Sequence, residues 1–596
     1  MKIPEFNTLR ELLLYSTDNY KNNKSFSYIN GITYTYGDLK EKADTIANIL
    51  DTYGIEKGDK VALLSQNMPN WPAAYFAATA TARVIVPLLP DFSENEVSNI
   101  IQHSESKAII VSAKLLHKVP KELIEASNVT INLDTLEIIS TKEGVSKTIS
   151  SVPSPDDLAS IIYTSGTTGN SKGVMHSHST LCKHLYAASI LRPGYEWDIW
   201  LSVLPLSHTL ESSLCMMLPM VSGASVYYLE KSPTPTVLLQ ALKQVRPTTM
   251  LTVPLIIEKI YKNAILPKFN KSKLISSIYK TTIGRKLLHR AAGKKLMETF
   301  GGRIRFFGVG GAKLDSTVER FLYEAKFPYA IGYGLTETAP LLAGAIPEFV
   351  KWQSTGPAVH GVTLRIDNPN PETGEGEIVA KGPNVMLGYY KNPEATEQAF
   401  TKDGWFRTKD LGVFDKQGRL YIKGRLSNMI LGPSGENIYP EEIETVINGH
   451  ELVVESLVKE NKGKLVALVH FNPDKLQALH DAKDEALKAY FEKKEQLIKL
   501  YEEKREELQK SYDVKKEELM KQYQVKRDEA IQVYNEKKEE AVKAFNAKLD
   551  QLKKDVSEYV NSRVNKFSKI SVVHDHPEQF EKTATHKIKR YLYEKK

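Results

Sequence analysis

One long stretch near the C-terminal end constrains the fold more than any other feature. Residues 475–560 hold 20 basic and 20 acidic residues and no glycine or proline, which predicts helix throughout. Aromatic residues recur every 11 positions, and a leucine or alanine follows each one by seven positions. The two series are Tyr490, Tyr501, Tyr512, Tyr523, Tyr534, Phe545 and Leu497, Leu508, Leu519, Ala530, Ala541, Leu552. Eleven residues make about three helical turns, so both series follow one narrow, slightly right-handed stripe.

This stripe predicts a coiled-coil arm that packs against another helix; the alternative is an isolated helix stabilised by Lys–Glu pairs. A straight helix of about 80 residues spans roughly 120 Å, yet both ends of the arm should return to one small domain. No turn residues mark the middle of the arm, and the 11-residue phase runs through it unbroken. Two arrangements remain: a hairpin whose turn uses helix-forming residues, or an arm exchanged with a second copy of the chain in a homodimer.

The preceding part of the chain has a different pattern. Between residues 60 and 260, short apolar runs alternate with helical patterns, which is typical of βαβ units in an α/β core. The runs are KVALLSQN, VIVPLLP, AIIVSA, LASIIY, WLSVLPLS, ASVYYL and TTMLTVP. Residues 362–424 predict β-hairpins, one with the turn DKQG, and residues 425–472 predict a small α+β unit. A chain of 596 residues is too long for one core, so we expect several domains.

Composition narrows the functional classes. The chain has only two cysteines, Cys182 and Cys215, which excludes a disulfide framework and a four-cysteine metal site and fits a reducing cytosol. The N-terminus lacks a long apolar segment, and the most apolar run, residues 214–229, is shorter than a membrane span. The net charge of +8 is mild for this length and does not indicate nucleic-acid binding. We therefore expect a cytoplasmic protein.

Residues 262–305 form a basic segment with 12 lysines and arginines and a single acid, Glu298. One interpretation is a solvated helical face. The alternative is contact with an anionic partner: the inner face of a membrane, to which the protein would be peripheral, or a polyanionic substrate.

A glycine-rich loop, YTSGTTGNSKG at residues 163–173, follows a predicted buried strand. It is not a P-loop, which requires G-x-x-x-x-G-K-[ST], because Ser171 precedes Lys172 and Gly173 follows it. Successive backbone N–H groups and hydroxyls with little side-chain bulk are typical of an anion-binding nest, and Lys172 adds a positive charge. The candidate phosphate-binding residues are Thr164, Ser165, Gly166, Thr167, Thr168, Gly169 and Lys172. The alternative is an ordinary surface loop.

The segment IGYGLTET, residues 331–338, is a second candidate. Its residues of interest are Gly332, Tyr333, Gly334, Thr336 and Glu337. Glycines on both sides of the tyrosine would let its ring stack on a planar base. A carboxylate close to a phosphate loop is a typical Mg²⁺ ligand, although Thr-Glu also begins many helices.

Three further segments complete the set. GWFRTKDLGVFD places Asp410 among apolar residues, where a carboxylate can accept two ribose hydroxyls; the alternative is a turn aspartate. Residues 422–444 contain a Gly-Pro-Ser-Gly turn and predict a hinge between domains. EKTATHKIKR, residues 581–590, sets Lys587 among small and hydroxyl residues, and on its own it is a basic tail.

Taken in order, these five segments resemble the adenylate-forming superfamily of acyl-CoA synthetases, luciferases and peptide-synthetase adenylation domains. The resemblance spans almost the whole chain except the arm. YTSGTTGNSKGV is similar to the family's phosphate loop, GYGLTE to its adenine and magnesium motif, GWFRTKDLG to its ribose motif, KGRLSNMI to its hinge and KTATHKIKR to its C-terminal lysine motif. LPLSH (204–208) resembles the motif whose histidine, here His208, flanks the acyl pocket. SGENIYPEEIE and the C-terminal ending look most like long-chain fatty acid–CoA ligases.

The resemblance implies a two-step reaction. A fatty acid carboxylate would attack the α-phosphate of ATP and expel pyrophosphate, and the thiol of CoA would then attack the acyl-AMP. The same resemblance implies Mg²⁺ on Thr164 and Glu337, ribose on Asp410 and a nucleotide contact from Arg425. Lys587 would bridge the carboxylate and the α-phosphate until the C-terminal domain rotates it away.

The implied fold is α/β, with a large adenylate-forming domain of several subdomains and a small α+β C-terminal domain interrupted by the helical arm. The expected bounds are 1–424 for the N-terminal adenylation domain, 425–474 with 561–596 for the mobile C-terminal domain, and 475–560 for the inserted arm. Four residues depart from the family's pattern: Ser171 replaces Pro, Lys409 replaces Gly, Ser427 replaces Asp or Lys, and His586 replaces Gly.

Two other functions remain open at this point. The enzyme would stop at acyl-AMP and pass the acyl group to a carrier protein, or the chain would be a scaffold whose arm acts while its ligase core is impaired. All five motifs keep their charged residues, which favours an active core. These residues are Lys172, Glu337, Asp410, Arg425 and Lys587.

Overall fold

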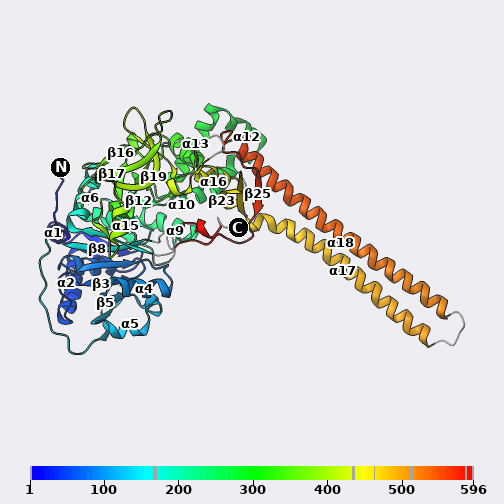
Figure 1. Ribbon diagram of the computed structural model, residues 1–596, viewed down its shortest axis with the longest axis horizontal. Coiled ribbons are helices and arrows are strands. Elements are labelled where there is room, and N and C mark those ends of the chain that lie inside the picture. Colours follow the sequence, from blue (N-terminus) through cyan, green and yellow to red (C-terminus); the bar gives the residue numbers. More distant parts are fainter. Residues whose placement is uncertain are drawn as a thin grey trace. The chain divides into compact units, whose positions relative to one another are not determined.

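In the computed structural model, the chain folds into two compact units (Figure 1). The first unit holds residues 1–428 together with 582–596, and the second holds residues 429–581. The segment that carries Lys587 therefore groups with the large unit. The division falls directly after Asn428, next to Ser427 of the predicted hinge. The structure describes residues 3–164, 171–231, 233–269, 271–431, 437–461, 463–510, 516–583 and 587–593.

An eight-stranded sheet in the first unit takes four of its five parallel strands from the predicted apolar runs, and the fifth, β6, was not among them. Strands β8, β4, β3, β5 and β6 run parallel, and β7, β9 and β18 add antiparallel strands at the two ends. The order across the sheet is β18 (Gly388–Tyr389), β9 (Lys172–Ser177), β8 (Leu158–Thr164), β4 (Val84–Leu88), β3 (Lys60–Leu64), β5 (Ser106–Val111), β6 (Val129–Asn132) and β7 (Ile138–Thr141). Its helices are α2 (Tyr36–Thr52), α3 (Asn70–Thr79), α4 (Glu94–Ser104) and α5 (Lys121–Ala126).

A second eight-stranded sheet of the first unit is also built from parallel strands that alternate with helices along the chain. Its inner strands are parallel, and its two edge strands, β2 and β15, are antiparallel. The order is β15 (Leu341–Gly344), β14 (Tyr329–Gly334), β13 (Phe306–Val309), β12 (Thr249–Thr252), β10 (Ile199–Ser202), β11 (Ser225–Tyr228), β1 (Lys24–Tyr28) and β2 (Thr33–Thr35). The helices of this part are α1 (Leu9–Asn19), α6 (His178–Leu191), α7 (Thr209–Glu211), α8 (Leu218–Ser222), α9 (Pro235–Val245), α10 (Pro254–Ile260), α11 (Leu266–Phe269), α12 (Lys273–Lys280), α13 (Thr282–Thr299) and α14 (Ser316–Ala325). The α/β core predicted from the apolar runs is confirmed.

A four-stranded antiparallel sheet completes the first unit. Its strands, in order, are β16 (Thr363–Asp367), β17 (Gly376–Lys381), β19 (Phe406–Phe414) and β20 (Leu420–Arg425), and α15 (Pro393–Gln398) precedes β19. The predicted hairpins are confirmed as β16–β17 and β19–β20. Asp415 closes the DKQG turn by accepting a hydrogen bond from the Gln417 N–H at 2.9 Å.

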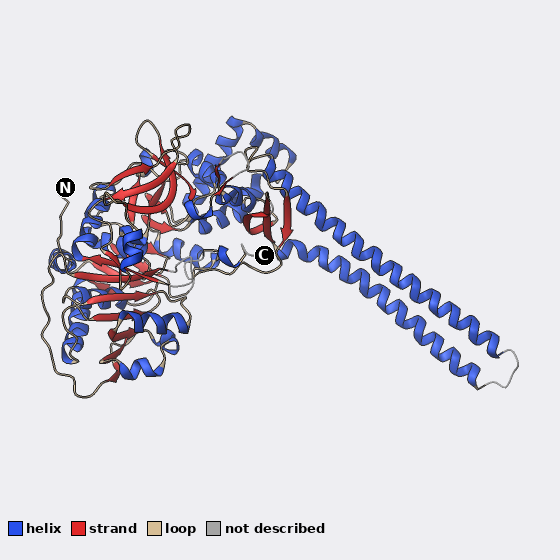
Figure 2. Cartoon of the chain, in the orientation of Figure 1, coloured by secondary structure: helices blue, strands red, loops and turns tan. Residues whose placement is uncertain are grey.

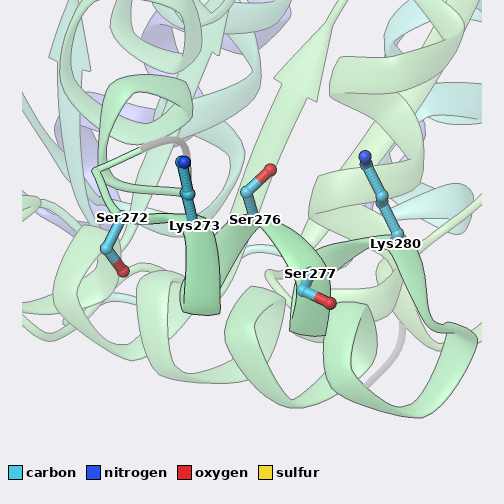
Figure 3. Close-up of a pocket in the computed structure, with 5 residues that line it drawn as sticks. All are labelled: Ser272, Lys273, Ser276, Ser277 and Lys280. Carbon is cyan, nitrogen blue, oxygen red and sulfur yellow. The ribbon is translucent and has the colours of Figure 1, made fainter.

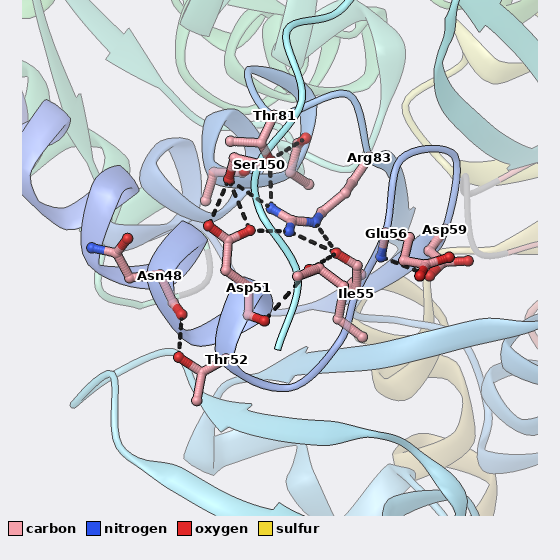
Figure 4. A network of polar contacts seen from close by, with 12 residues as sticks. Asn48, Asp51, Thr52, Ile55, Glu56, Asp59, Thr81, Arg83 and Ser150 are labelled. Atoms are coloured by element: carbon pink, nitrogen blue, oxygen red, sulfur yellow. Dashed lines mark hydrogen bonds and ion pairs between the residues drawn. The ribbon is translucent and has the colours of Figure 1, made fainter. Parts of the chain in front are cut away.

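A buried arginine ties distant segments of the first unit together (Figure 4). The guanidinium of Arg83, whose side chain is 1% exposed, pairs with the Asp51 carboxylate at the end of α2. It also donates to the Ile55 carbonyl at 2.9 Å and to the Thr81 hydroxyl at 2.8 Å. The Ser150 hydroxyl donates to Asp51 at 2.9 Å. Because a buried charge is tolerated only when it is paired and hydrogen-bonded, this network fixes the connections around β4.

The second unit is a small α+β fold with its own core. Strands β23 (Val453–Asn461) and β24 (Lys464–Phe471) form the hairpin predicted across NKGK, and β25 (Val572–Asp575) pairs parallel with β24. The unit also contains β21 (Ile430–Leu431), β22 (Asn437–Ile438) and α16 (Pro440–Asn448). The core packs Ile443 and Val469 with Val556 and Val560 from the end of the arm. The base of the arm therefore belongs to the folded core of this unit.

The helical arm consists of two helices that lie side by side, α17 (Pro473–Gln509) and α18 (Lys516–Asn561) (Figure 2). The ring centroids of Tyr501 and Tyr523 are 5.8 Å apart, and the Lys494 amine lies 4.6 Å from the Tyr534 ring centroid. The structure therefore contains the hairpin, the first of the two expected arrangements, and one continuous helix over 475–560 is wrong. Tyr512 and the other residues of 511–515 lie outside the described part of the chain.

The 11-residue repeat is compatible with this hairpin because Tyr501 and Tyr523 each lie 11 residues from Tyr512. A hairpin centred on a repeat position brings equivalent layers of the two helices face to face. A supercoiled coiled coil and a dimer through the arm stay predictions. Among the helices of the described residues, none combines the length and the apolar character needed to cross a membrane.

Candidate nucleotide-binding active site

The two ends of the glycine-rich loop are held by an antiparallel pair of strands. Thr164 is the last residue of β8 and pairs with Lys172, the first residue of β9. The Thr164 hydroxyl donates to the Lys172 carbonyl at 3.5 Å. The candidates Ser165, Gly166, Thr167, Thr168 and Gly169 lie outside the described residues. Thr164 and Lys172 are thus placed at the mouth of the loop, on adjacent strands.

The second candidate segment spans the end of β14 and a 3-10 helix, η4 (Thr336–Thr338). Gly332, Tyr333 and Gly334 are the last residues of β14. A Cβ on Gly334 would lie 1.8 Å from the Pro340 carbonyl oxygen, so only glycine fits where the chain folds back toward β15. This close approach sets Thr336 and Glu337 just beyond the strand end.

A histidine that the sequence did not single out supports this turn. The His176 Nε2–H donates to the Thr336 carbonyl at 2.7 Å. Complete burial lowers the pKa of His176 to about 4, so the ring is neutral at pH 7 and carries its proton on the donating nitrogen. His176 lies on β9 and therefore couples the glycine-rich loop to η4.

Tyr389 is a second site residue that the sequence missed. Its hydroxyl donates to Glu337 Oε1 at 2.9 Å, and the Lys172 amine lies 5.0 Å from the centroid of its ring. Strand β18 positions Tyr389 by pairing with β9, opposite Val174. Tyr389 therefore links the cation of the loop to the candidate metal-binding carboxylate. No spacing signal could find it, because 52 residues separate it from Glu337.

We expect Tyr389→Phe to raise the Mg²⁺ concentration needed for half-maximal activity by about tenfold, because removing a hydrogen bond that orients a metal-binding carboxylate weakens the metal. The ring contact with Lys172 is kept, so the variant isolates the hydroxyl. Pyrophosphate–ATP exchange titrated with Mg²⁺ measures the effect. The matched control is Tyr390→Phe, whose hydroxyl contacts Glu105 at 3.3 Å on the surface. An unchanged Mg²⁺ dependence in Tyr389→Phe would contradict the orienting role.

Asp410 lies at the centre of a group of three predicted residues. It is 7% exposed on β19 and stands opposite Arg425 of β20. The Arg425 Nε lies 3.0 Å from Asp410 Oδ1, and the Tyr333 hydroxyl donates to Asp410 Oδ2 at 2.9 Å. A cation from β20 and a hydroxyl from β14 thus hold the two carboxylate oxygens in place, and a carboxylate oxygen can accept more than one hydrogen bond, for example from a hydroxyl.

The backbone at the residue before Asp410 accounts for the glycine that the family has at this position. Lys409 has φ of 59°, in the left-handed region that favours glycine, and its side chain is exposed. The family's glycine thus fits the backbone geometry at this position, and lysine adopts the same geometry under strain.

We expect Lys409→Gly to stabilise the protein by about 1 kcal/mol, because it relieves the left-handed strain. Urea unfolding measures the difference. Lys416→Gly is the matched control on the same hairpin, since Lys416 is not among the residues with positive φ and glycine there only adds freedom to the unfolded chain. Equal destabilisation by both substitutions would refute the strain at Lys409.

Lys587 joins this group from the end of the chain. Lys587 is exposed as a residue, but protein atoms surround its amine. The loss of hydration there lowers the pKa of the amine, and the nearby positive charge of Arg425 lowers this pKa further. Asp410 and Glu337 oppose this shift, since their negative charges favour the ammonium form. His586, the neighbouring departure from the family's pattern, lies outside the described residues.

His208 also interacts with Lys587. Its Nδ1 accepts a hydrogen bond from the Leu210 N–H at 3.2 Å, which caps the start of α7. Burial and then the nearby Lys587 charge lower the pKa of His208 to about 4. The imidazole is therefore neutral at pH 7 and adds no positive charge beside Lys587.

The donor set suits a hard cation that is shared with phosphates. Within the described residues, no group of three or more His, Cys, Asp or Glu side chains could hold a metal. Mg²⁺ usually binds through one or two carboxylates, waters and substrate phosphates. Glu337 and the Thr164 hydroxyl offer such oxygens, so the residues present fit Mg²⁺ delivered with a nucleotide.

Comparison with known proteins agrees with this geometry. Residues 16–390 match the family described as AMP-binding enzyme. The chain is 27% identical over 449 residues to fatty acyl-CoA synthetase A of Dictyostelium discoideum, covering 68% of this chain and 66% of the relative. It is 31% identical to the 2-succinylbenzoate–CoA ligase of Bacillus licheniformis, covering 71% of this chain and 81% of the relative. The chain thus spans about two thirds of the first of these relatives and more of the second.

Solved structures share the fold. The o-succinylbenzoate CoA synthetase of Bacillus subtilis in complex with ATP and a magnesium ion has a TM-score of 0.69 at 21% identity, with 97% of this chain and 98% of that chain covered. The anthranilate CoA ligase AuaEII with anthranoyl-AMP has a TM-score of 0.71 at 16% identity, covering 99% and 98%. The expected adenylate-forming fold is confirmed. The comparisons support an acyl- or aryl-CoA ligase, a class that uses ATP, Mg²⁺ and CoA. The chain belongs to the family of AMP-binding, adenylate-forming enzymes.

Proposed function

We propose that this enzyme is a long-chain fatty acid–CoA ligase, which forms acyl-AMP from ATP and a fatty acid and then the acyl-CoA thioester. The observation that carries the proposal is the grouping of Lys587 with Glu337 and Asp410, because it sets a cation among the residues expected to hold metal and ribose. Relatives named long chain acyl-CoA synthetase, such as the peroxisomal enzyme 7 of Arabidopsis thaliana at 28% identity, support the fatty acid as substrate.

In the first half-reaction, a carboxylate oxygen of the fatty acid bonds to the α-phosphorus of ATP. The bond from that phosphorus to the bridging oxygen breaks, and the oxygen leaves with its electron pair on pyrophosphate. The Lys587 ammonium neutralises the carboxylate and α-phosphate oxygens as they meet, which is the type of electrostatic stabilisation that dominates such reactions. In this proposal the Lys172 ammonium binds the departing phosphates. Mg²⁺ on Glu337 and Thr164 supplies further positive charge when it is bound.

The nucleotide is held at its other end by the Asp410 group. The Asp410 carboxylate accepts hydrogen bonds from the ribose hydroxyls, while Tyr333 and Arg425 keep its two oxygens oriented. Tyr333 itself is 7% exposed in this structure. Stacking of its ring on the adenine therefore requires an opening at this side chain when ATP enters.

In the second half-reaction, the thiolate of CoA attacks the acyl carbonyl and AMP leaves with the electron pair of the mixed anhydride. We propose that the small C-terminal domain turns about the hinge at Ser427 and withdraws Lys587 before this step. Ser427 is exposed and its hydroxyl donates to the Asn428 side chain at 3.0 Å, a contact that a rotation can break at little cost.

The test is acid-dependent exchange of pyrophosphate into ATP, followed by thioester formation with CoA. Octanoate, palmitate, oleate and o-succinylbenzoate are compared as substrates. We expect the highest kcat/KM with palmitate or oleate and complete dependence of thioester formation on free CoA. Preference for o-succinylbenzoate would overturn the fatty acid assignment, and exchange without any reaction of CoA would favour a carrier-protein acceptor. No exchange with any acid would support the scaffold function instead.

A further inference from the structure

Helices α12 and α13 expose large aliphatic side chains that no part of the described fold covers. Leu274 and Ile278 on α12 are 71% and 42% exposed, and Ile283 and Leu287 on α13 are 76% and 61% exposed. Each pair is spaced by four residues, so its two members share one face of their helix. Isolated exposed aliphatic residues are common on proteins, but two such pairs on successive helices are a feature that needs an explanation.

The end of α12 packs on the start of α13. A Cβ on Gly284 would lie 2.5 Å from Cγ2 of Ile278, so Ile278 packs directly on the first turn of α13. Ile283 is the neighbour of Gly284 in the chain. We name these four exposed side chains, Leu274 and Ile278 of α12 with Ile283 and Leu287 of α13, the α12–α13 surface.

Cations surround this surface. Lys273, Lys280, Lys286, Arg290 and Lys294 are all exposed, and within the described residues none of them forms an ion pair. Arg285 of the same helix differs, because it pairs with Glu324 at 2.9 Å and serves the fold. No acidic residue occurs from 262 to 297. The cations are thus available to an external anion.

A hollow beside α12 gathers some of these groups. It has a volume of about 350 Å³ and is lined by Ser272, Lys273, Ser276, Ser277 and Lys280. Figure 3 shows the amines of Lys273 and Lys280 on the same side as the Ser276 hydroxyl. Two ammonium groups and a hydroxyl on one side are suitable partners for a phosphate group.

We propose that the α12–α13 surface binds an anionic lipid bilayer. Exposed leucine and isoleucine side chains enter the boundary between head groups and acyl chains, while the lysines contact head-group phosphates, as in other interfacial amphipathic helices. A nucleic acid or another soluble polyanion would use the cations but leave the aliphatic side chains in water. The surface contains no residue of the active site, so the inference stands independently of the fatty acid assignment.

The experiment is flotation of the full-length protein with vesicles of phosphatidylcholine alone or with an equal amount of phosphatidylglycerol. We expect binding to the mixed vesicles only, and weaker binding as salt rises. The double variant Lys273→Gln with Lys280→Gln should bind mixed vesicles about 30-fold more weakly, because each lysine near an anionic membrane strengthens binding by about fivefold. The variant Leu274→Gln with Ile283→Gln should also lose binding, while its exchange activity with octanoate is retained.

Matched controls come from an exposed linker of the first unit. Ile149 is 90% exposed and Lys147 is exposed, so Ile149→Gln and Lys147→Gln remove the same chemical groups elsewhere. Neither control should change vesicle binding. The proposal is wrong if the wild-type protein fails to float with mixed vesicles, or if both double variants float as the wild type does. A wild-type protein that floats with mixed vesicles but shows no exchange with any acid would instead count against the proposed reaction and leave the membrane proposal standing.

Discussion

Lys587→Ala lowers the rate of acyl-adenylate formation by roughly 10³-fold, while preformed acyl-AMP still reacts with CoA. The magnitude follows from the cost of removing a group that stabilises developing charge in a closed site. Lys587 is the group that connects the carboxylates of Glu337 and Asp410 with His208, which is neutral at pH 7. Without it, the acid carboxylate approaches an anionic α-phosphate with no cation between them. Single-turnover assays of each half-reaction measure the two rates separately.

The matched control is Lys589→Ala, two residues further along the same segment. It removes an equal charge from the same tail and should leave both half-reactions within about twofold of the wild type. Thermal unfolding shows whether either variant is misfolded. If Lys587→Ala slows the thioester step as much as the adenylation step, the residue acts in both, and its assignment to the first half-reaction is wrong.

The region around Asp410 contains one feature that the sequence predicts, the hairpin, and one that it does not, the strand register. The DKQG turn correctly predicts the β19–β20 hairpin, because turn chemistry is local. The pairing of Asp410 with Arg425 depends on an irregularity between Leu411 and Gly412, which shifts the register by one residue. A strand pattern alone does not reveal such a bulge, because it depends on contacts with the neighbouring strand.

In the candidate site, the sequence could not predict contacts between residues of separate strands and helices. Tyr389 reaches Glu337 only because β18 pairs with β9, and the pairing of such short strands is set by the surrounding fold. The sequence left a hairpin and an exchanged arm open for another reason. The 11-residue phase passes through Tyr512 without interruption, so hydrophobic periodicity carries no mark of where α17 ends and α18 begins.

Asp410→Asn should lower kcat/KM for ATP by roughly 10²- to 10³-fold, mainly through a higher KM. The substitution keeps the shape of the side chain but removes the charge that two ribose hydroxyls would share, and hydrogen bonds to charged groups are worth about 1.5–3 kcal/mol each. It also turns an amide donor toward Arg425 or Tyr333, so that one of the two contacts at 3.0 Å and 2.9 Å is lost. Because the ribose lies away from the reacting atoms, this loss affects ground state and transition state nearly equally, which is the pattern of a KM effect.

A control on the same strands separates this effect from damage to the hairpin. Lys423 of β20 pairs with Glu375 at 2.9 Å, so Lys423→Met breaks an ion pair of the same sheet without touching Asp410. It should leave KM for ATP within about twofold of the wild type, since partly exposed ion pairs contribute little. Steady-state exchange kinetics at varied ATP give both parameters. A fall in kcat with unchanged KM for Asp410→Asn would place Asp410 at the reacting phosphate rather than at the ribose, because only an interaction made in the transition state alone lowers kcat without changing KM.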